Sequence, residues 1–440
     1  MNLLSYQKYK DSGVAWLGVI PAHWSVKRLK YISQITSSGV WGEDPPLDST
    51  GYRVATTANI DMIGKIDVDG MTVRDLSEED LKQGLCLPGD IIVVKSSGSA
   101  TNVITGKAGL VKEEHGPICF SNFTLRVRPS RKATDNRFVW YFLNSDVVRA
   151  QIRLMVSTTT YPNLQVSEYG LFSLPVPHFE EQRAIADYLD RETAKIDALV
   201  AAKERLLEIL AEKRRVLITR AVTRGLNPGA QLRDSGIPWL GPIPAHWELE
   251  RARWLFHERD ERSETGEEEM LTVSHLTGVT PRSEKNVNMF EAETTEGYKV
   301  CYTGDLVINT LWAWMGAMGV SPMHGIVSPA YHIYTPCERL DPAYVDVLVR
   351  IPVFAEEAIR FSKGVWSSRL RLYPEGLYEI WLPVPPRDEQ RVIVAHIASE
   401  TIKLDALRAA AERTISLSKE RRAALIGAAV TGRIKVSSSQ

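Results

Sequence analysis

The sequence predicts an α+β protein with two globular mixed α/β domains separated by two long antiparallel coiled-coil helices, arranged as an internal pseudo-two-fold repeat. Three observations support this: a tandem repeat, two long segments with heptad spacing, and β-branched segments that follow Gly-Asp turns. With 440 residues the chain also exceeds one compact core, because a domain usually holds about 100–200 residues. We therefore expect more than one domain.

The repeat is clearest at the edges of its two copies. Residues 11–24 recur as residues 234–247, an offset of 223, and both segments end in Ile-Pro-Ala-His-Trp. The Leu-Pro-Val-Pro segment 174–177 and the Glu-Gln-Arg triplet 181–183 recur at an offset of 208, so the second copy is 15 residues shorter in between. Since the edges agree and the centres differ, we interpret the chain as one scaffold that carries two different recognition surfaces.

Between these edges the copies share only sparse landmarks. Residues 88–94 and 303–309 each contain a Gly-Asp turn that opens a β-branched strand. Residues 121–129 and 328–336 are also strand-like and end at proline. These segments predict the sheets of the two domains.

Two long segments predict helices. Residues 180–223 contain neither proline nor glycine, and their apolar residues follow heptad spacing: Ile185, Leu189, Ile196, Leu199, Leu206, Leu210 and Leu217. At 1.5 Å per residue such a helix extends on the order of 60 Å. A second apolar series follows near the end of the chain: Ile393, Ile397, Leu404, Leu407 and Leu425. We expect the two helices to pack against each other in antiparallel orientation.

Composition narrows the class of protein. A hydrophobic content of 44% with 24% charged residues is typical of a folded protein and argues against disorder. No signal peptide and no run of 18 apolar residues is present, so we expect a cytoplasmic protein without a membrane span. The net charge of −1 lacks the basic footprint of most nucleic-acid-binding proteins, so positive charge would have to be local or supplied by a partner.

Catalytic and metal-binding patterns are missing from the sequence. The four cysteines are scattered without paired metal-ligand spacing, which predicts isolated buried thiols and no metal. The segment from Asp44 to Leu47 resembles an Asp-Pro-Pro-aromatic methyltransferase motif but ends in leucine, so we interpret it as a turn. His23 and His246 lie in the repeated Pro-Ala-His-Trp turn and are expected to be structural. We predict a chain that has no catalytic activity of its own.

Together, the repeat, the Ile-Pro-Ala-His-Trp openings, the Gly-Asp strands, the Leu-Pro-Val-Pro and Glu-Gln-Arg exits and the helices resemble the specificity (S) subunits of type I restriction-modification enzymes, over nearly all of residues 11–433. The resemblance implies two target recognition domains, residues 1–179 and 224–387. It also implies two spacer helices, residues 180–223 and 388–433, and leaves residues 434–440 as a tail.

The resemblance also implies a function in phage defence. Each recognition domain would read one half of a bipartite double-stranded DNA site, while the helices set the spacer and dock two methyltransferase (modification) subunits. Restriction/translocase subunits would join through the complex. S-adenosylmethionine, ATP and Mg²⁺ would be bound by these partners, and no cofactor by this chain.

Base reading needs hydrogen-bond donors and acceptors of fixed geometry, so we searched the two domains for loops rich in them. In the first domain the candidates are Lys95, Ser96, Ser97, Ser99, Thr101 and Asn102, together with Ser157, Thr158, Thr159, Thr160, Tyr161 and Asn163. In the second domain they are Asn309, Thr310, Trp312, Trp314, Lys363, Trp366, Ser367, Ser368, Arg369 and Arg371. The alternatives are solvated loops and, for the tryptophans, core packing.

A different class of function also fits the helices. A coiled-coil adaptor between proteins, without sequence-specific DNA binding, would explain them but would leave two divergent domains without a task.

Overall fold

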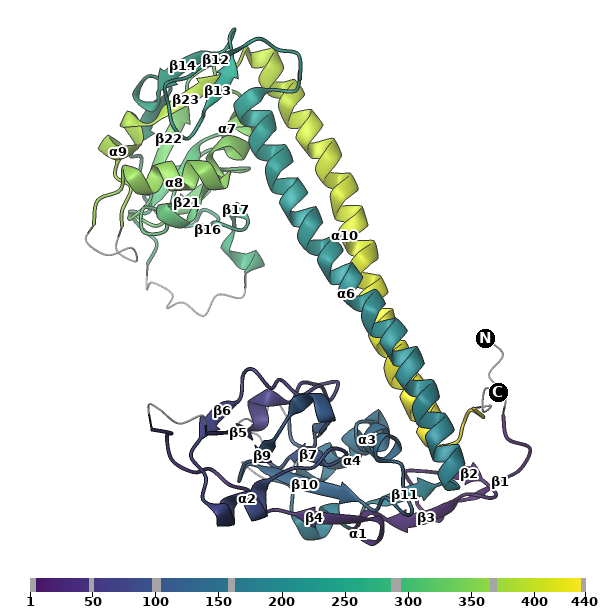
Figure 1. Cartoon of the computed structure of the whole chain (residues 1–440). Helices are drawn as coiled ribbons and strands as arrows, with labels where there is room; N and C mark the ends of the chain where they lie inside the picture. Colours follow the sequence, from purple (N-terminus) through teal and green to yellow (C-terminus); the bar gives the residue numbers. More distant parts are fainter. Residues whose placement is uncertain are drawn as a thin grey trace. The chain divides into compact units, whose positions relative to one another are not determined.

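The computed structural model describes residues 5–46, 51–96, 104–156, 163–285, 294–364 and 370–436. The chain forms two compact units (Figure 1). Unit 1 comprises Met1–Lys203 and Arg413–Gln440, and unit 2 comprises Glu204–Glu412. Helices α6 (Phe179–Arg224) and α10 (Arg387–Val430) each contribute residues to both units.

Unit 1 is organised around a four-stranded antiparallel sheet with strand order β4-β10-β7-β8. A three-stranded sheet β6-β5-β9 and two strand pairs, β1-β2 and β11-β3, complete it. The strands are β1 (Tyr9–Asp11), β2 (Val19–Pro21), β3 (Ser25–Arg28), β4 (Ser33–Thr36), β5 (Tyr52–Ala55), β6 (Thr72–Arg74), β7 (Ile91–Val94), β8 (Ala108–Leu110), β9 (Ile118–Phe120), β10 (Thr124–Pro129) and β11 (Ser173–Val176). The shorter helices are α1 (Leu29–Ile32), α2 (Glu78–Gly84), α3 (Asn136–Leu143), α4 (Asp146–Val156), α5 (Val166–Tyr169) and the 3-10 turns η1 (Thr57–Asn59) and η2 (Glu113–His115).

Unit 2 repeats the four-stranded sheet in the same order, as β15-β22-β19-β20, and the strand pairs as β12-β13 and β14-β23. Two separate strand pairs, β16-β17 and β18-β21, are found where unit 1 has its three-stranded sheet. The strands are β12 (Leu232–Asp234), β13 (Pro242–Pro244), β14 (Glu248–Arg251), β15 (Phe256–Arg259), β16 (Leu271–Ser274), β17 (Gly278–Pro281), β18 (Lys299–Cys301), β19 (Leu306–Ile308), β20 (Met318–Val320), β21 (Gly325–Val327), β22 (His332–Pro336) and β23 (Trp381–Val384). The helices are α7 (Pro342–Val349), α8 (Pro352–Arg360), α9 (Pro374–Glu379) and the 3-10 turns η3 (Ala252–Trp254), η4 (Arg282–Glu284) and η5 (Ala313–Met315).

The repeated sequence motifs build the same contacts in each unit. Trp24 and Trp247 are fully buried in the two main cores. His23 Nε2 lies 2.9 Å from a Glu181 carboxylate oxygen, and His246 Nε2 lies 2.8 Å from the equivalent oxygen of Glu389. The prediction that both histidines are structural is therefore confirmed.

One buried glutamine at the start of each long helix binds that helix to its own domain. The Gln182 side chain donates to the carbonyls of Ala133 and Pro177 and accepts from the backbone N–H of Asp135. Gln390 makes the equivalent bonds in unit 2, donating to Arg339 and Pro385 and accepting from Asp341. Because buried polar groups are costly unless they are hydrogen-bonded, these fully satisfied amides fix the start of each helix.

Helices α6 and α10 pack antiparallel, as the sequence predicted. In unit 1 Arg422 of α10 pairs with Asp197 of α6, and in unit 2 Asp405 of α10 pairs with Arg214 of α6. The later residue of α6 therefore contacts the earlier residue of α10, as antiparallel packing requires. In unit 1, Ile185 and Leu189 share the main core with the end of α10. The predicted α+β fold with two antiparallel helices is confirmed.

The predicted apolar seam needs a correction at two positions. Ile185, Leu189, Ile196 and Leu210 are buried on α6, as are Ile393, Ile397 and Leu404 on α10, while Leu206, Leu217 and Leu425 are half-buried. Leu199 and Leu407, however, are 44% and 55% exposed. A straight helix drifts by about 20° per heptad relative to a 3.5-residue repeat, so a strict heptad pattern overstates the buried stripe.

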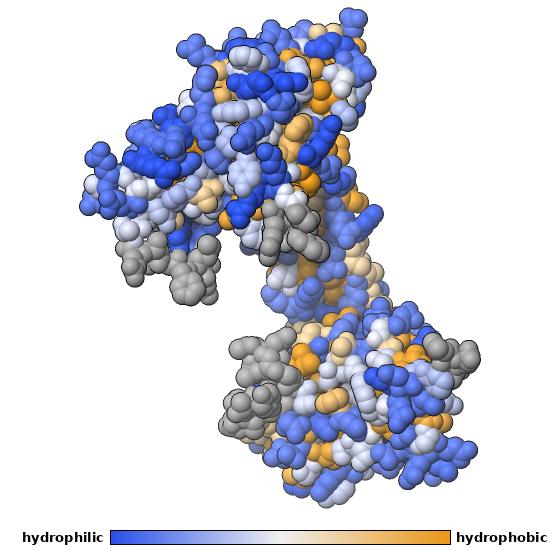
Figure 2. Space-filling model, turned by 90° about the vertical axis from the view of Figure 1, so that its left-hand side faces the viewer, coloured by the Kyte–Doolittle hydropathy of each residue, from blue (hydrophilic) through white to orange (hydrophobic). Residues whose placement is uncertain are grey.

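The described surface of both units is mainly hydrophilic where Figure 2 shows it, with smaller hydrophobic areas. Within the described part of the chain, no helix is both long enough and apolar enough to cross a membrane.

Candidate nucleic-acid interface

The two candidate segments of the first copy meet at their bases. Lys95 directly follows β7; its N–H donates to the Phe123 carbonyl (3.0 Å), and its own carbonyl accepts from the N–H of Leu164 (2.7 Å). Ser96 forms an antiparallel bridge with Asn163. Residues 95–96 and 163–164, widely separated in sequence, are thus joined at one end of the sheet.

Most residues of these two segments lie outside the described residues: Ser97, Ser99, Thr101, Asn102, Ser157, Thr158, Thr159, Thr160 and Tyr161. Lys95 and Ser96 are half-buried and Asn163 is exposed.

An aromatic cluster next to Lys95 was missed by the sequence analysis. Phe123 is 54% exposed, and its ring lies edge-on to the ring of Trp41 at a centroid distance of 6.4 Å. The Arg74 guanidinium lies 4.5 Å from the centre of the Trp41 ring and pairs with Asp44. The Asp44 carboxylate therefore holds this arginine, and Leu47 of the predicted turn lies outside the described residues. An exposed ring over a fixed arginine offers a stacking surface for a base or sugar.

In the second copy, some of the candidate residues are buried and others are exposed. Asn309 and Thr310 are 5% and 3% exposed, so they support the turn rather than present groups to a ligand. Asn309 donates from its side-chain amide to the Tyr331 hydroxyl (2.9 Å) and accepts from the Leu311 N–H. This burial argues against the contacts predicted for both residues.

The tryptophans of the same turn are more accessible. Trp312 is 51% exposed and lies nearly parallel to Trp314, with ring centroids 6.2 Å apart. Trp314 is half-buried and donates from Nε1 to the Leu311 carbonyl (3.1 Å). Trp314 thus supports the ring that faces solvent.

The remaining second-copy segment is held by a two-bond bridge. Lys363 and Arg371 are both exposed, and each donates its N–H to the other's carbonyl at 2.9 Å. Trp366, Ser367, Ser368 and Arg369 lie between them, outside the described residues.

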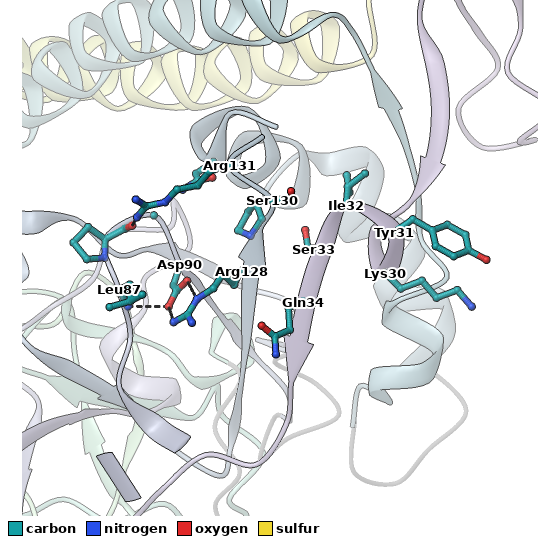
Figure 3. A pocket seen from close by; sticks show the side chains of 14 residues that line it. Lys30, Tyr31, Ile32, Ser33, Gln34, Leu87, Asp90, Arg128, Ser130 and Arg131 are labelled. Atoms are coloured by element: carbon teal, nitrogen blue, oxygen red, sulfur yellow. Dashed lines mark hydrogen bonds and ion pairs between the residues drawn. The ribbon is translucent and has the colours of Figure 1, made fainter. Parts of the chain in front are cut away.

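At the other end of β7 and β19 from Lys95 and Asn309, the Gly-Asp turn of each copy carries a buried carboxylate. Asp90 accepts two hydrogen bonds of 2.7 Å from the Arg128 guanidinium of β10 and one from the Leu87 N–H (Figure 3). Both residues line a pocket of about 640 Å³. Asp305 accepts equivalently from the Tyr302 N–H, but its arginine is Arg259 of β15.

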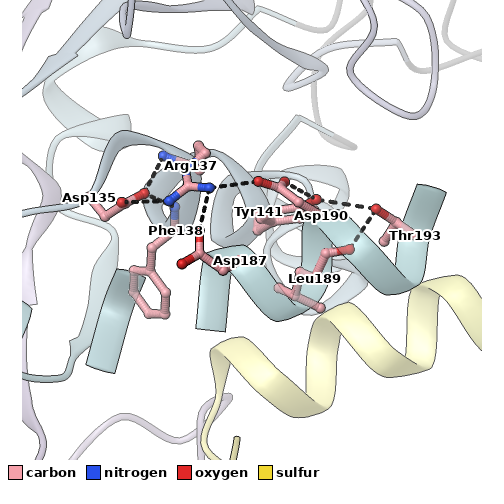
Figure 4. Close-up of polar contacts among 8 residues, drawn as sticks. All are labelled: Asp135, Arg137, Phe138, Tyr141, Asp187, Leu189, Asp190 and Thr193. Carbon is pink, nitrogen blue, oxygen red and sulfur yellow. Dashed lines mark hydrogen bonds and ion pairs between the residues drawn. The ribbon is translucent and has the colours of Figure 1, made fainter. Parts of the chain in front are cut away.

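Unit 1 also holds α3 against α6 through one arginine (Figure 4). Arg137 donates to Asp187 and Asp190 of α6, both at 2.7 Å, and to Asp135 at 3.2 Å. The Tyr141 hydroxyl donates to Asp190 at 2.7 Å, and burial raises its pKa. This network fixes α3 of unit 1 to the first turns of α6.

All four cysteines are free thiols, and at least two of them are held in the protonated form. Burial raises the pKa of the Cys119 thiol to about 11 and that of Cys301 to about 11, so both are protonated at neutral pH. Cys86 is buried as well, whereas Cys337 is half-buried, contrary to the prediction that all four are buried. Among the described residues, no group of three or more His, Cys, Asp or Glu side chains is placed to hold a metal ion.

Comparisons with known proteins agree with this architecture. Residues 21–208 match the model of the type I restriction modification DNA specificity domain. The chain is 24% identical over 228 residues to the StySPI specificity subunit of Salmonella potsdam, which covers 50% of this chain and 47% of that protein. It is 25% identical over 216 residues to the EcoKI specificity subunit of Escherichia coli K12, covering 48% and 45%. The chain thus spans about half the length of these curated relatives.

Two solved structures share the fold. One, from work on complex assembly and conformational transition of the type I R-M system, aligns with a TM-score of 0.68 at 17% identity, covering 93% of this chain and 98% of that one. The HsdS subunit from Thermoanaerobacter tengcongensis aligns with a TM-score of 0.54 at 18% identity, covering 94% and 98%.

The fold is that of a protein with two copies of the same sheet scaffold, in which the candidate residues after the equivalent strands β7 and β19 differ. Residues 21–208 match the type I restriction modification DNA specificity domain, and about half of the chain is similar to curated specificity subunits, in agreement with the resemblance seen in the sequence.

Proposed function

We propose that this chain reads a bipartite DNA site for a type I restriction-modification complex, one half-site with each domain. The observation that carries the proposal is the placement of the candidate loops. Lys95 in unit 1 and Asn309 in unit 2 directly follow β7 and β19, which hold the same place in the two sheets, yet the candidate side chains that follow them in the sequence differ. A common frame with unlike contact groups is what reading two different half-sites requires.

The exposed rings extend the proposed contact set. Phe123 beside Lys95 in unit 1 and Trp312 in unit 2 are large, accessible aromatic groups next to the candidate loops. They would stack on a base or sugar or wedge a base step, while loop donors read base edges.

The helices would set the spacer and dock methyltransferase subunits, two per complex. Exposed apolar residues recur at equivalent places on α6 and α10, since Leu199 corresponds to Leu407 and Ile209 to Leu417. The four side chains are 44–57% exposed and would be covered by a helical partner. The domain boundaries at residues 179, 223 and 387 belong to the same proposal.

Catalysis would lie in the partner chains. The methyltransferase subunits would bind S-adenosylmethionine, and restriction subunits would bind ATP and Mg²⁺. A protein that serves cellular DNA in this way would work in the cytoplasm.

The test is to produce the chain together with its methyltransferase subunit and map methylated adenines by single-molecule sequencing. We expect one two-part motif with an unread gap of fixed length. Shortening α6 and α10 by seven residues each should change the gap and leave both half-sites unchanged. Alone, the chain should bind DNA poorly and with strong salt sensitivity.

Two outcomes would contradict the proposal. A complex that assembles but protects and methylates DNA without sequence preference would favour the coiled-coil adaptor. Methylation by the isolated chain supplied with S-adenosylmethionine would overturn its non-catalytic role.

A further inference from the structure

One exposed aromatic residue occupies the same place in both units. Tyr31 is the third residue of α1, directly after β3, and is 71% exposed, and Trp254 is the third residue of η3, directly after β14, and is 67% exposed. A single exposed ring on a protein surface is ordinary and needs no explanation. The recurrence in both copies is what calls for one.

Strand register establishes that the two positions are equivalent. Arg28 lies opposite Ser173 in the β3-β11 pair, and Arg251 lies opposite Trp381 in the β14-β23 pair. The next N–H in each copy, that of Leu29 or Ala252, donates to the carbonyl that precedes β11 or β23, at 2.8 and 2.9 Å. The aromatic residue follows two positions later in both copies.

Few other exposed large apolar residues recur in this way among the described residues. The recurring pairs are Tyr9 with Leu232, Leu87 with Tyr302, Leu199 with Leu407, Ile209 with Leu417, and Tyr31 with Trp254, and the last pair is the most exposed. Figure 3 shows that Tyr31 is one of the residues that line the pocket and that its ring is turned away from the Asp90–Arg128 pair.

The rings lie at the opposite end of each sheet from the candidate DNA loops. Tyr31 precedes Ser33, which lies opposite Pro129, whereas Lys95 follows Val94, which lies opposite Thr124 at the other end of β10. In unit 2 Trp254 precedes Phe256, opposite Pro336, whereas Asn309 follows Ile308, opposite His332. At about 3.3 Å per residue, the strand between the two ends is about 13–17 Å long.

We propose that Tyr31 and Trp254 are the anchor residues of two equivalent protein-docking sites, each of which receives one copy of the methyltransferase subunit. This inference rests on the proposed function. Two domains with unlike DNA loops have reason to keep one surface alike when the same chain binds both. Tyrosine and tryptophan are enriched among residues that dominate binding energy, and each ring would enter an apolar pocket of the partner.

The ring, rather than charge, is the shared element. In unit 1, Lys27, Arg28 and Lys30 are exposed around Tyr31, and the Lys30 ammonium lies 5.2 Å from the centre of its ring. In unit 2, Arg251 and Arg253 are both paired with Glu379. A phosphate-binding role would require free cations in both copies, so this difference favours an apolar contact.

The experiment measures how many methyltransferase subunits the full-length chain binds, by native mass spectrometry over a titration. Tyr31→Ser and Trp254→Ser should each weaken binding of one of the two subunits by about 10- to 30-fold, the effect typical of a strong interface anchor. The double variant should weaken both. Tyr31→Phe and Trp254→Phe should restore binding, because the ring is retained.

Met62→Ser and Leu276→Ser serve as matched controls, since these side chains are 62% and 75% exposed and have no apolar counterpart among the recurring pairs. Their complexes should form as in the wild type. Thermal unfolding of each free variant checks that loss of binding does not reflect loss of folding.

Wild-type stoichiometry and affinity in the double variant would overturn the docking sites while leaving the proposed function intact. Full assembly combined with weakened DNA binding would also overturn them, by assigning the rings to DNA. If the wild-type chain bound no methyltransferase subunit at all, the proposed function itself would fail and the docking sites with it.

Discussion

The two units use the same sheet but hold its Gly-Asp turn with arginines from different strands. In unit 1 Asp90 is held by Arg128 of the neighbouring strand β10, and in unit 2 Asp305 is held by Arg259 of the edge strand β15. Both carboxylates are almost completely buried and both also accept a backbone N–H. A buried carboxylate requires a cation and filled hydrogen bonds, and either strand meets that requirement. The position of the buried aspartate in the sheet is therefore the same in both units, although the strand that supplies its arginine differs.

The satellite sheets differ more deeply. In unit 1, β5 pairs in parallel with β9 and antiparallel with β6, whereas unit 2 has two antiparallel pairs in their place. These regions lie within the segment where the second copy is 15 residues shorter. Elements that adjoin the long helices are repeated closely, and elements away from them have diverged.

The largest expected effect comes from the residue that the two units share most closely. Trp24→Ala and Trp247→Ala should each cost about 3–5 kcal/mol through lost burial and a cavity. Each variant should loosen only its own unit, which hydrogen exchange at β3 and β14 would resolve. Equal loss of protection in both units from one variant would mean that the units do not unfold separately.

A smaller effect should separate the two Gly-Asp turns. Asp90→Asn removes the carboxylate that faces Arg128 and should lower the free energy of unfolding by about 3 kcal/mol. Asp305→Asn should cost less, about 1–2 kcal/mol, because Arg259 keeps a hydrogen bond to Thr335 and its place over the Tyr302 ring. Denaturant unfolding checks this, with exposed Asp69→Asn as the control. Equal costs would show that the strand of origin does not matter.

DNA contacts should be separable by half-site. Phe123→Ala and Trp312→Ala should each weaken binding of the assembled complex by about 1–3 kcal/mol, the usual contribution of one stacked base. Footprinting should show loss of protection at one half-site for the first variant and at the other half-site for the second. Equal weakening by the control Met62→Ala would remove the aromatic rings from the proposed interface.

The smallest effect on stability is expected on the helices. Leu199→Ser and Leu407→Ser should change the free energy of unfolding by no more than about 0.5 kcal/mol, because both side chains are exposed. Leu189→Ala, at a fully buried position of the same helix, should cost about 2–5 kcal/mol. Thermal unfolding of the free chain distinguishes them, and a large loss in L199S would mean that this leucine is part of the packed seam.

Much of the fold could be predicted because repeats and periodicity report packing directly. The offset of 208 at the Glu-Gln-Arg triplet already identified Gln182 and Gln390 as equivalent, and the structure shows that both fasten a helix. Heptad spacing predicted two antiparallel helices, yet it could not tell that Leu199 faces outward. Heptad spacing predicts which face of a helix is apolar, but it does not predict how much of that face the neighbouring helix covers.

The candidate site was harder to predict, because residue type does not reveal whether a polar group is already used. Asn309 has the donors and acceptors of a base-reading residue, but its side-chain amide is already hydrogen-bonded to Tyr331 and to the Leu311 N–H. Phe123 was overlooked for the opposite reason, since an aromatic residue just before a strand reads as core. Its exposure follows from the loop geometry at the sheet end, and no local pattern encodes that.

The division of α10 between the units also bears on the order in which the protein is made. The core of unit 1 includes Ile426, Ala429, Val430 and Ile434, which are synthesised after all of unit 2. At about 5–20 residues per second, residues up to 203 wait roughly 10–40 s for residue 413. Unit 2 has all its residues by then, so we expect it to fold first on the ribosome. Ile185 and Leu189 lack their neighbours on α10 until residues 426–430 have been made, so we expect the core of unit 1 to be completed after that of unit 2.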